Sequence, residues 1–315
     1  MKKIMLLTLS LLLLLCPAGC AADGEQDPRP QVVATVFPQY DLVRAIAGDT
    51  VNLTLLLPPG GESHGYEPTP KNMAAVTACD LFIEIGGPSE QWAADLRQAA
   101  AGDAAAPRVL TLMALEGITL LNTAESNADH DHIHEHDHTR EIDEHIWLSV
   151  HNAAIMAETI CQELCALVPE NAALYRTNTD AYLEELEALD ARLTEITAQA
   201  ARRTLIFGDR FPFRYLTHDY GLTAYAAYPG CAVEGEPAPA TVAALIERIK
   251  AEQIPVVFTI EFSRGEVADA ITAETGAKRL ELHSCHNLSP ADFAAGVTYL
   301  DLMHRNADAL AEALN

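Results

Sequence analysis

Positively charged residues are scarce in this sequence, in which 20 lysines and arginines face 45 aspartates and glutamates, giving a formal net charge of −25. Proteins that bind nucleic acid need lysine and arginine to neutralise phosphates, so this charge balance argues against a nucleic-acid partner. Long hydrophobic runs are also lacking after the first twenty residues, where no stretch reaches the length that spans a bilayer. An acidic composition is compatible with cation binding, but it is common enough to give only weak support.

The first twenty residues have the pattern of an export signal. Two lysines precede an apolar run at residues 4–15, which is too short for an ordinary membrane-spanning helix. The sequence PAGC at residues 17–20 resembles a lipobox, in which Cys20 receives the lipid. We expect residues 1–20 to be a lipoprotein signal peptide and residues 21–30 a tether. The body is then exported and anchored by lipid to the outer face of the cytoplasmic membrane, or is periplasmic after ordinary signal cleavage.

Cysteines are too few and too irregularly spaced to predict a disulfide framework. Of the seven in the chain, Cys16 leaves with the signal and Cys20 carries the lipid, so an odd number remains. Cys161 and Cys165 lie one helical turn apart in an apolar stripe and are expected to be buried thiols. Cys231 and Cys285 fall in predicted loops and are candidates for a disulfide in an exported protein.

Short β-branched runs alternate with helical patterns in two separate series, which predicts an α/β fold with two lobes, each built on a parallel sheet. We expect an N-terminal lobe at residues 31–170 and a C-terminal lobe at residues 204–315. The last helix is expected to run from residue 290 to 315. The predicted strands lie at residues 32–37, 51–57, 81–85, 108–112, 204–208, 223–227, 255–260 and 278–282.

One long amphipathic helix is predicted between the two lobes, at residues 171–203. Its apolar side chains recur mostly every three or four residues, as on one face of a helix. A helix of about 30 residues is about 45 Å long, which exceeds the size of one small lobe. It is therefore expected to lie across both.

A histidine-rich stretch occupies a segment without apolar periodicity, residues 122–144, which we interpret as a loop. Imidazole and carboxylate groups are ligands for divalent metals such as Zn²⁺, so this stretch predicts an accessory site that collects metal. His145 follows it within the sequence DEHIW and is a candidate ligand of a folded site. The loop histidines occupy every second position: His130, His132, His134, His136 and His138.

Further residues with ligand atoms follow predicted strands. Ligands of open parallel α/β sheets bind beyond the carboxyl ends of the strands. His64 lies in the loop after the strand at 51–57, Asp209 directly follows 204–208, and Glu261 directly follows 255–260. His283 and His286 come after the strand at 278–282. Their shared placement predicts a divalent ion held between the lobes.

Four motifs together resemble the zinc/manganese solute-binding lipoproteins of metal ABC importers (cluster A-I), in the family's order. The histidine-rich loop resembles the zinc-type members. The resemblance implies two (β/α)₄-like lobes joined by one long rigid helix, with the metal in the cleft between them. It also implies a non-enzymatic, monomeric protein that captures Zn²⁺ and delivers it to a permease. The motifs are LLLPPG with HGYEPTP (residues 55–60 and 64–70), DEHIWL (143–148), the helix pattern at 184–190, and EPAP (236–239).

The resemblance carries over to most of the ligand set but fails at one position. His64 and His145 match the family's first two ligands, and Glu261 falls where it has an acidic fourth ligand. The family's third ligand is a histidine, whereas Arg210 occupies that slot here, and a guanidinium cannot donate to a metal. Asp209 and His286 are equal candidates for the third ligand. His283 could also serve, or the site could consist of three ligands plus water.

Two rival functions follow from the same residues. More carboxylate among the ligands suits Mn²⁺ and more imidazole suits Zn²⁺, so the fold could instead carry Mn²⁺ or Fe²⁺. A distant alternative is a metal-dependent hydrolase, which needs an open coordination position and a general base. Glu62 or Glu67, both near His64, could be offered as that base.

Overall fold

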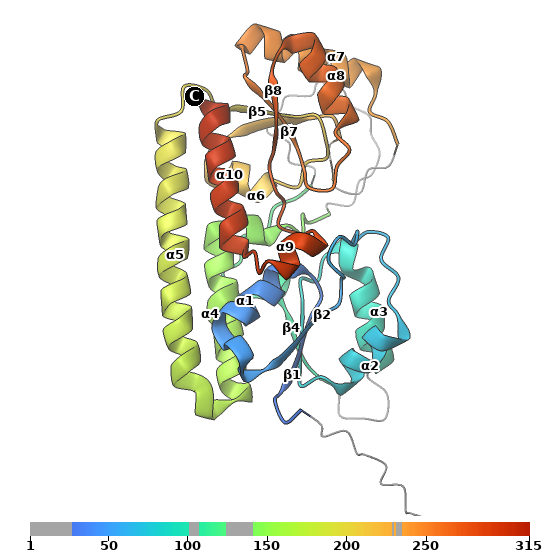
Figure 1. Ribbon diagram of the computed structural model, residues 1–315, viewed down its shortest axis with the longest axis vertical. Helices are drawn as coiled ribbons and strands as arrows, with labels where there is room; N and C mark the ends of the chain where they lie inside the picture. The colour runs from blue at the N-terminus through green and yellow to red at the C-terminus, as the bar shows by residue number, and fades with distance from the viewer. Residues whose placement is uncertain (1–26, 101–106, 124–140, 229, 231–234) are drawn as a thin grey trace, which may run out of the picture.

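The computed structural model describes residues 27–100, 107–123, 141–228, 230 and 235–315. It contains two four-stranded parallel sheets, with strand orders β2-β1-β3-β4 and β6-β5-β7-β8. The expected α/β class with two parallel sheets is therefore confirmed. Figure 1 shows one lobe above the other, with long helices running along one side of both.

The first sheet is built from short strands that are largely buried. β1 and β3 are central, and Leu81, Phe82 and Ile83 on β3 are fully buried, as expected where helices cover both faces of a parallel sheet. The elements of this lobe are β1 (Gln31–Ala34), α1 (Phe37–Ala47), β2 (Asn52–Leu55), α2 (Pro70–Ala78), β3 (Leu81–Glu84), α3 (Gln91–Ala100) and β4 (Arg108–Thr111).

The second sheet repeats the strand order of the first. Its central strand β7 has all four residues buried, and the outer strand β8 is mostly exposed. The elements are β5 (Thr204–Phe207), α6 (Arg214–Asp219), β6 (Thr223–Ala226), α7 (Pro239–Glu252), β7 (Val256–Thr259), α8 (Glu266–Thr275) and β8 (Lys278–Glu281).

The predicted long helix is α5 (Ala172–Ala198), whose 27 residues extend about 40 Å. It packs against α4 (Val150–Leu167) and α1 from the first lobe and against α10 (Tyr299–Leu314). Its buried stripe includes Tyr182, Leu186, Leu189 and Leu193. Figure 1 shows α5 along the side of both lobes, so that it ties them together.

The C-terminal segment differs from the expectation of a single helix from residue 290. It forms two helices, α9 (Pro290–Ala294) and α10, separated by a break at Gly296, which adopts a positive φ of 74°. Glycine tolerates this conformation without the steric cost of a Cβ. Thr298 then starts α10 with a capping box to Asp301. The break lets the chain turn at the first lobe and return along α5.

Several expectations fall on residues outside the described ranges. These include the five loop histidines, His130, His132, His134, His136 and His138, and also Cys20 and Cys231. At the base of the histidine-rich loop, the described residues Asn122 and Ile142 form an isolated antiparallel bridge. Cys285 is fully buried as a free thiol. Within the described ranges, no helix is long and apolar enough to cross a membrane.

Candidate metal centre

The segment after β8 leaves the second lobe and lies against the first. The backbone N–H of Phe37 donates to the carbonyl of His286 at 3.3 Å, and the N–H of Gly60 donates to the carbonyl of Leu288 at 2.7 Å. The amide of Asn287 donates to the carbonyl of Pro58 at 2.8 Å. These bonds seat the loop bearing His286 on the first lobe, beside the loop that bears His64.

His145 is held rigidly just before the short 3₁₀ turn Ile146–Leu148. Its side chain is buried, and Asp143 Oδ1 lies 2.8 Å from its ring atom Nδ1 and 2.9 Å from its backbone nitrogen. A carboxylate that accepts from one ring nitrogen fixes the tautomer and leaves the other nitrogen for a metal, as is usual for metal-binding histidines. The arrangement therefore presents Nε2 of His145 as the donor.

Two side chains from the second lobe hold Asp143 in turn. Arg214 Nε lies 3.4 Å from Asp143 Oδ2, and the Tyr215 hydroxyl donates to the Asp143 carbonyl at 2.6 Å. Both residues are on α6, which follows closely after Arg210. Arg210 occupies the position at which the family has its third histidine ligand. The orientation of His145 thus depends on contacts between the lobes, which the sequence motifs did not indicate.

The rings of His145 and His286 are in edge-to-face contact, although the chain separates them by more than a hundred residues. Their ring centroids are 5.7 Å apart at an interplanar angle of 89°, and both rings contact Trp147. Two imidazoles that bind one zinc ion at ~2.0–2.1 Å in tetrahedral directions have ring centres roughly 5–6 Å apart. The spacing of this pair is therefore suited to a shared ion.

The charge state of His286 also suits metal binding. Burial lowers the pKa of His286 well below its usual value, and the nearby His145, His64 and Arg210 lower that pKa further. The ring is consequently neutral at neutral pH, and only a neutral imidazole has a lone pair for a metal.

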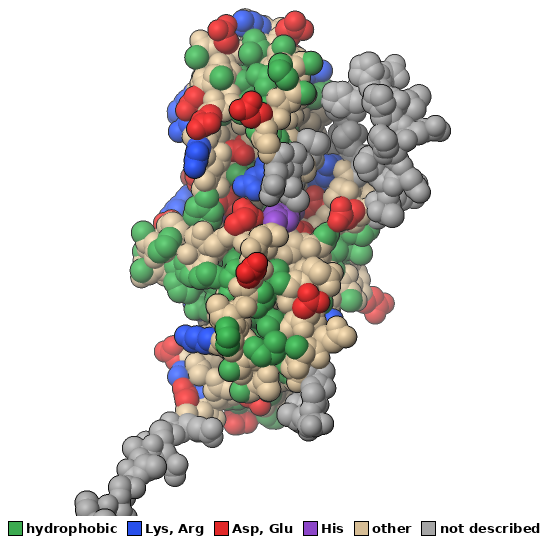
Figure 2. Space-filling view, turned by 90° about the vertical axis from the view of Figure 1, so that its right-hand side faces the viewer, with side chains coloured by type: hydrophobic (Ala, Val, Ile, Leu, Met, Phe, Trp, Pro, Cys, Tyr) green, Lys and Arg blue, Asp and Glu red, His purple; other side chains and the backbone are tan. Residues whose placement is uncertain are grey.

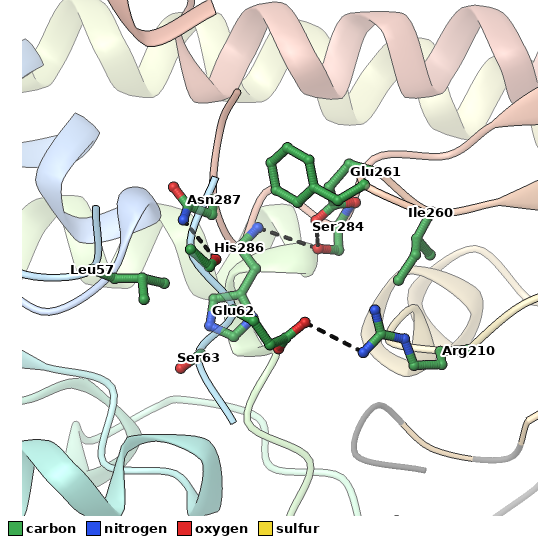
Figure 3. Close-up of a pocket in the computed structure, with 11 residues that line it drawn as sticks. Leu57, Glu62, Ser63, Arg210, Ile260, Glu261, Ser284, His286 and Asn287 are labelled. Carbon is green, nitrogen blue, oxygen red and sulfur yellow. Dashed lines mark hydrogen bonds and ion pairs between the residues drawn. The ribbon is translucent and has the colours of Figure 1, made fainter. Parts of the chain in front are cut away.

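A small cavity of about 30 Å³ lies beside His286, between the lobes. Its lining includes Glu62 and Ser63 from the first lobe and Arg210 and Glu261 from the second. Figure 3 shows the His286 ring beside Glu62, with Arg210 opposite. Pockets for drug-sized molecules occupy ~300–1,000 Å³, so this cavity suits an ion with a few waters.

His64 lies on an exposed part of its loop. Its backbone nitrogen lies 3.5 Å from a carboxylate oxygen of Glu62, and its ring is close enough to affect the pKa of His286. Figure 2 shows a histidine at the surface where the two lobes meet, with acidic and basic side chains around it. Within the described part of the chain, no three His, Cys, Asp or Glu side chains are grouped closely enough to hold an ion.

Glu261 is buried at the carboxyl end of β7 and lines the cavity. Its carboxylate accepts the backbone N–H of Ser284 at 2.8 Å and the Ser284 hydroxyl. These donors hold the carboxylate in the cleft and leave it able to share an oxygen with a cation, since each oxygen accepts more than one bond.

Asp209 and His283 make other contacts. Both oxygens of Asp209 face backbone nitrogens, that of Arg210 at 2.8 Å and that of Ile260 at 3.4 Å. His283 accepts the backbone N–H of Cys285 at Nδ1, 2.9 Å away. Neither residue lines the cavity, nor do His64 and His145. His286 is placed beside His145, with ring centroids 5.7 Å apart.

The hydrolase alternative finds no support at Glu62. Its carboxylate lies 3.5 Å from the guanidinium of Arg210, and an ion-paired carboxylate is a weak general base. Glu67 is exposed on the same loop and does not line the cavity.

We expect Asp143→Asn to weaken zinc binding by about 10- to 100-fold, the usual cost of removing the partner of a metal-binding histidine. Asparagine retains an acceptor for Nδ1 but loses the charge that makes Nε2 a better donor. Competition titration with a chromophoric chelator measures the change. Asp219→Asn is the matched control, because Asp219 lies 3.0 Å from Nδ1 of the exposed His218. Equal affinities in both variants would show that Asp143 does not support a ligand.

The fold and the cleft together define a class of protein: a two-lobed binding protein whose lobes are joined by a long helix rather than by flexible strands. Residues 32–313 match the family model described as "Zinc-uptake complex component A periplasmic". This chain belongs to that family.

Individual relatives agree with this assignment. The chain is 33% identical over 311 residues to the zinc-binding lipoprotein AdcA of Streptococcus pneumoniae (strain TIGR4), covering 98% of this chain but only 60% of AdcA. It is 31% identical over 294 residues to the high-affinity zinc uptake system protein ZnuA of Bacillus subtilis, covering 93% of this chain and 90% of ZnuA.

A solved structure shows the same fold. The Zn(II)-bound ZnuA-like domain of Streptococcus pneumoniae AdcA superposes with a TM-score of 0.73 at 28% sequence identity. The match covers 91% of this chain and 99% of that domain. The similarity to AdcA is therefore confined to part of that longer protein.

Proposed function

We propose that this protein captures Zn²⁺ outside the cytoplasmic membrane and delivers it to the permease of an ABC importer. The observation that carries the proposal is the contact between the rings of His145 and His286, with Asp143 fixing the ring of His145. The match to a zinc-uptake family and the zinc named in the descriptions of its relatives support the same cargo.

The proposed ligands are His64, His145 and His286, with Glu261 as the fourth. Three imidazoles and one carboxylate form a tetrahedral donor set that suits zinc better than manganese, which favours oxygen ligands. His286 takes the role of the family's third histidine, because its ring lies beside that of His145 and lines the cavity. The His64 loop closes over the ion, and Glu261 shares an oxygen while keeping its bonds to Ser284.

Three further parts complete the proposal. The loop histidines at positions 130–138 collect zinc weakly near the cleft, and lipid on Cys20 anchors the tether of residues 21–30. The helix predicted at residues 171–203 limits the lobes to a small closing motion, so docking on the permease drives release. The protein acts as a monomer and catalyses no reaction.

Metal titration tests the cargo. Purified metal-free protein is expected to bind one Zn²⁺ tightly and several more weakly, and deletion of residues 129–138 is expected to remove only the weak events. Equimolar Mn²⁺ should not displace zinc, because zinc ranks above manganese in affinity for such sites. If the protein instead retains Mn²⁺ or Fe²⁺ preferentially under competition, that metal rather than zinc is its cargo.

A further inference from the structure

Arg210 places a fixed positive charge in the cleft where a cation is expected to bind. It lines the same small cavity as Glu261 and His286, and its charge is close enough to lower the pKa of His286. Its guanidinium lies 3.5 Å from Oε2 of Glu62, which belongs to the opposite lobe. Figure 3 shows this pair spanning the cavity.

Glu62 connects Arg210 to the loop that bears His64. The other oxygen of Glu62, Oε1, lies 3.5 Å from the backbone nitrogen of His64. The side chain of Arg210 is 27% exposed and that of Glu62 is 56% exposed, so water screens the pair. An exposed pair of this kind changes an equilibrium constant by less than about fivefold, which makes it easy to separate.

We propose that Arg210 acts as a tethered cation that pairs with Glu62 in the metal-free cleft and opposes binding of the divalent ion. This inference rests on the proposed function and concerns the same site. Arg210 thereby lowers the affinity for zinc and holds the His64 loop near the cleft before the metal arrives. The residue sets affinity without donating to the metal, since a guanidinium has no lone pair to offer.

Two effects of removing the charge oppose each other. Loss of the pair with Glu62 loosens the His64 loop, but that cost is small for an exposed pair. Repulsion between a unit charge and a divalent ion a few ångströms away is larger, because the energy scales with the product of the charges. The net expectation for Arg210→Gln is about tenfold tighter zinc binding.

The inference is tested by chelator-competition titration of Zn²⁺ with four variants of the full chain. Arg210→Gln should bind about tenfold more tightly than the parent, and Arg210→Lys, which keeps the charge, should stay near the parent. Glu62→Gln alone should weaken binding, because it leaves the charge of Arg210 unneutralised beside the ion. Combined with Arg210→Gln it should cancel much of the gain, because the two positions then carry no net charge, as in the parent.

Arg248→Gln is the matched control, because Arg248 pairs with Glu252 on α7, away from the cleft. The inference is overturned if Arg210→Gln binds zinc no more tightly than this control, or if Arg210→Lys tightens binding equally. Melting of the metal-free variants shows whether each is folded. If the parent chain does not bind zinc, the proposed function is contradicted instead. Failure of the inference and failure of the proposed function are therefore distinguishable.

Discussion

Replacing His145 with alanine is expected to abolish tight zinc binding while the protein stays folded. His145 is the most completely positioned of the proposed ligands, with its ring bonded to Asp143 and packed on Trp147. Removal of a direct ligand should cost more than the ~10- to 100-fold typical of a supporting residue. We expect at least about a 1,000-fold loss, which corresponds to about 4 kcal/mol.

Thermal unfolding with and without zinc checks this expectation. A ligand that binds only the folded state stabilises that state by ~4 kcal/mol when the free ligand concentration is ~1,000 times the Kd. Zinc should raise the melting temperature of the parent and leave that of His145→Ala unchanged. The control is His218→Ala, which removes an exposed histidine on α6. An undiminished zinc-dependent shift in His145→Ala would remove His145 from the site.

A second large effect is expected on stability, at the buried Asp41 of α1. Its carboxylate accepts Arg44 Nε at 2.9 Å and the backbone N–H of Tyr299, the first residue of α10, at 2.7 Å. Arg44 also donates to the carbonyl of Val297 at 2.9 Å. Asp41→Ala removes the acceptor from a buried N–H and from a partly buried cation. We expect a loss of about 3 kcal/mol in the free energy of unfolding.

Asp41→Asn separates the hydrogen bonds from the charge. Burial raises the pKa of Asp41 against the opposing effects of Arg44 and the Tyr299 N–H, so keeping the carboxylate ionised has a free-energy cost. The neutral isostere should therefore lose only about 1 kcal/mol. Chemical denaturation of all three proteins measures the differences. A loss below about 1 kcal/mol in Asp41→Ala would mean that the junction between α1 and α10 does not depend on this carboxylate.

This junction bears on the proposed function because it joins the two lobes. α10 begins against α1 in the first lobe and runs along α5 to the second, so two helices join the lobes. Loosening the start of α10 should increase the motion between His286 and His145, since the Tyr299 hydroxyl also donates to the Trp147 carbonyl at 2.6 Å.

The order of the elements could be predicted from the sequence because each predicted strand is a compact apolar run with turn residues at its ends. The long helix was predictable from its apolar stripe. The break at Gly296 was not, because residues on both sides of it continue a helical pattern. The capping box of Thr298 and Asp301 starts α10, and the contact of the Tyr299 N–H with Asp41 fixes that start against α1.

The candidate ligands were predictable as a group, since all but His145 follow predicted strands and His145 lies in the DEHIW motif. The contacts that bring His286 to His145 were not predictable. The segment bearing His286 reaches the first lobe through backbone bonds from Phe37 to His286 and from Gly60 to Leu288, which leave no pattern in the sequence. Arg214 and Tyr215 matter only through their contacts with Asp143. The lack of a histidine at position 210 was visible in the sequence. In the structure, the guanidinium of Arg210 at that position lies opposite Glu62.

Anomalous diffraction at the zinc edge, from crystals of the zinc-loaded protein, tests the central proposal most directly. We predict one strong peak in the cleft, at ~2.0–2.2 Å from Nε2 of His145, from a ring nitrogen of His64 and of His286, and from a carboxylate oxygen of Glu261. A peak ligated by Asp209 in place of His286, or a peak away from His145, would contradict the account.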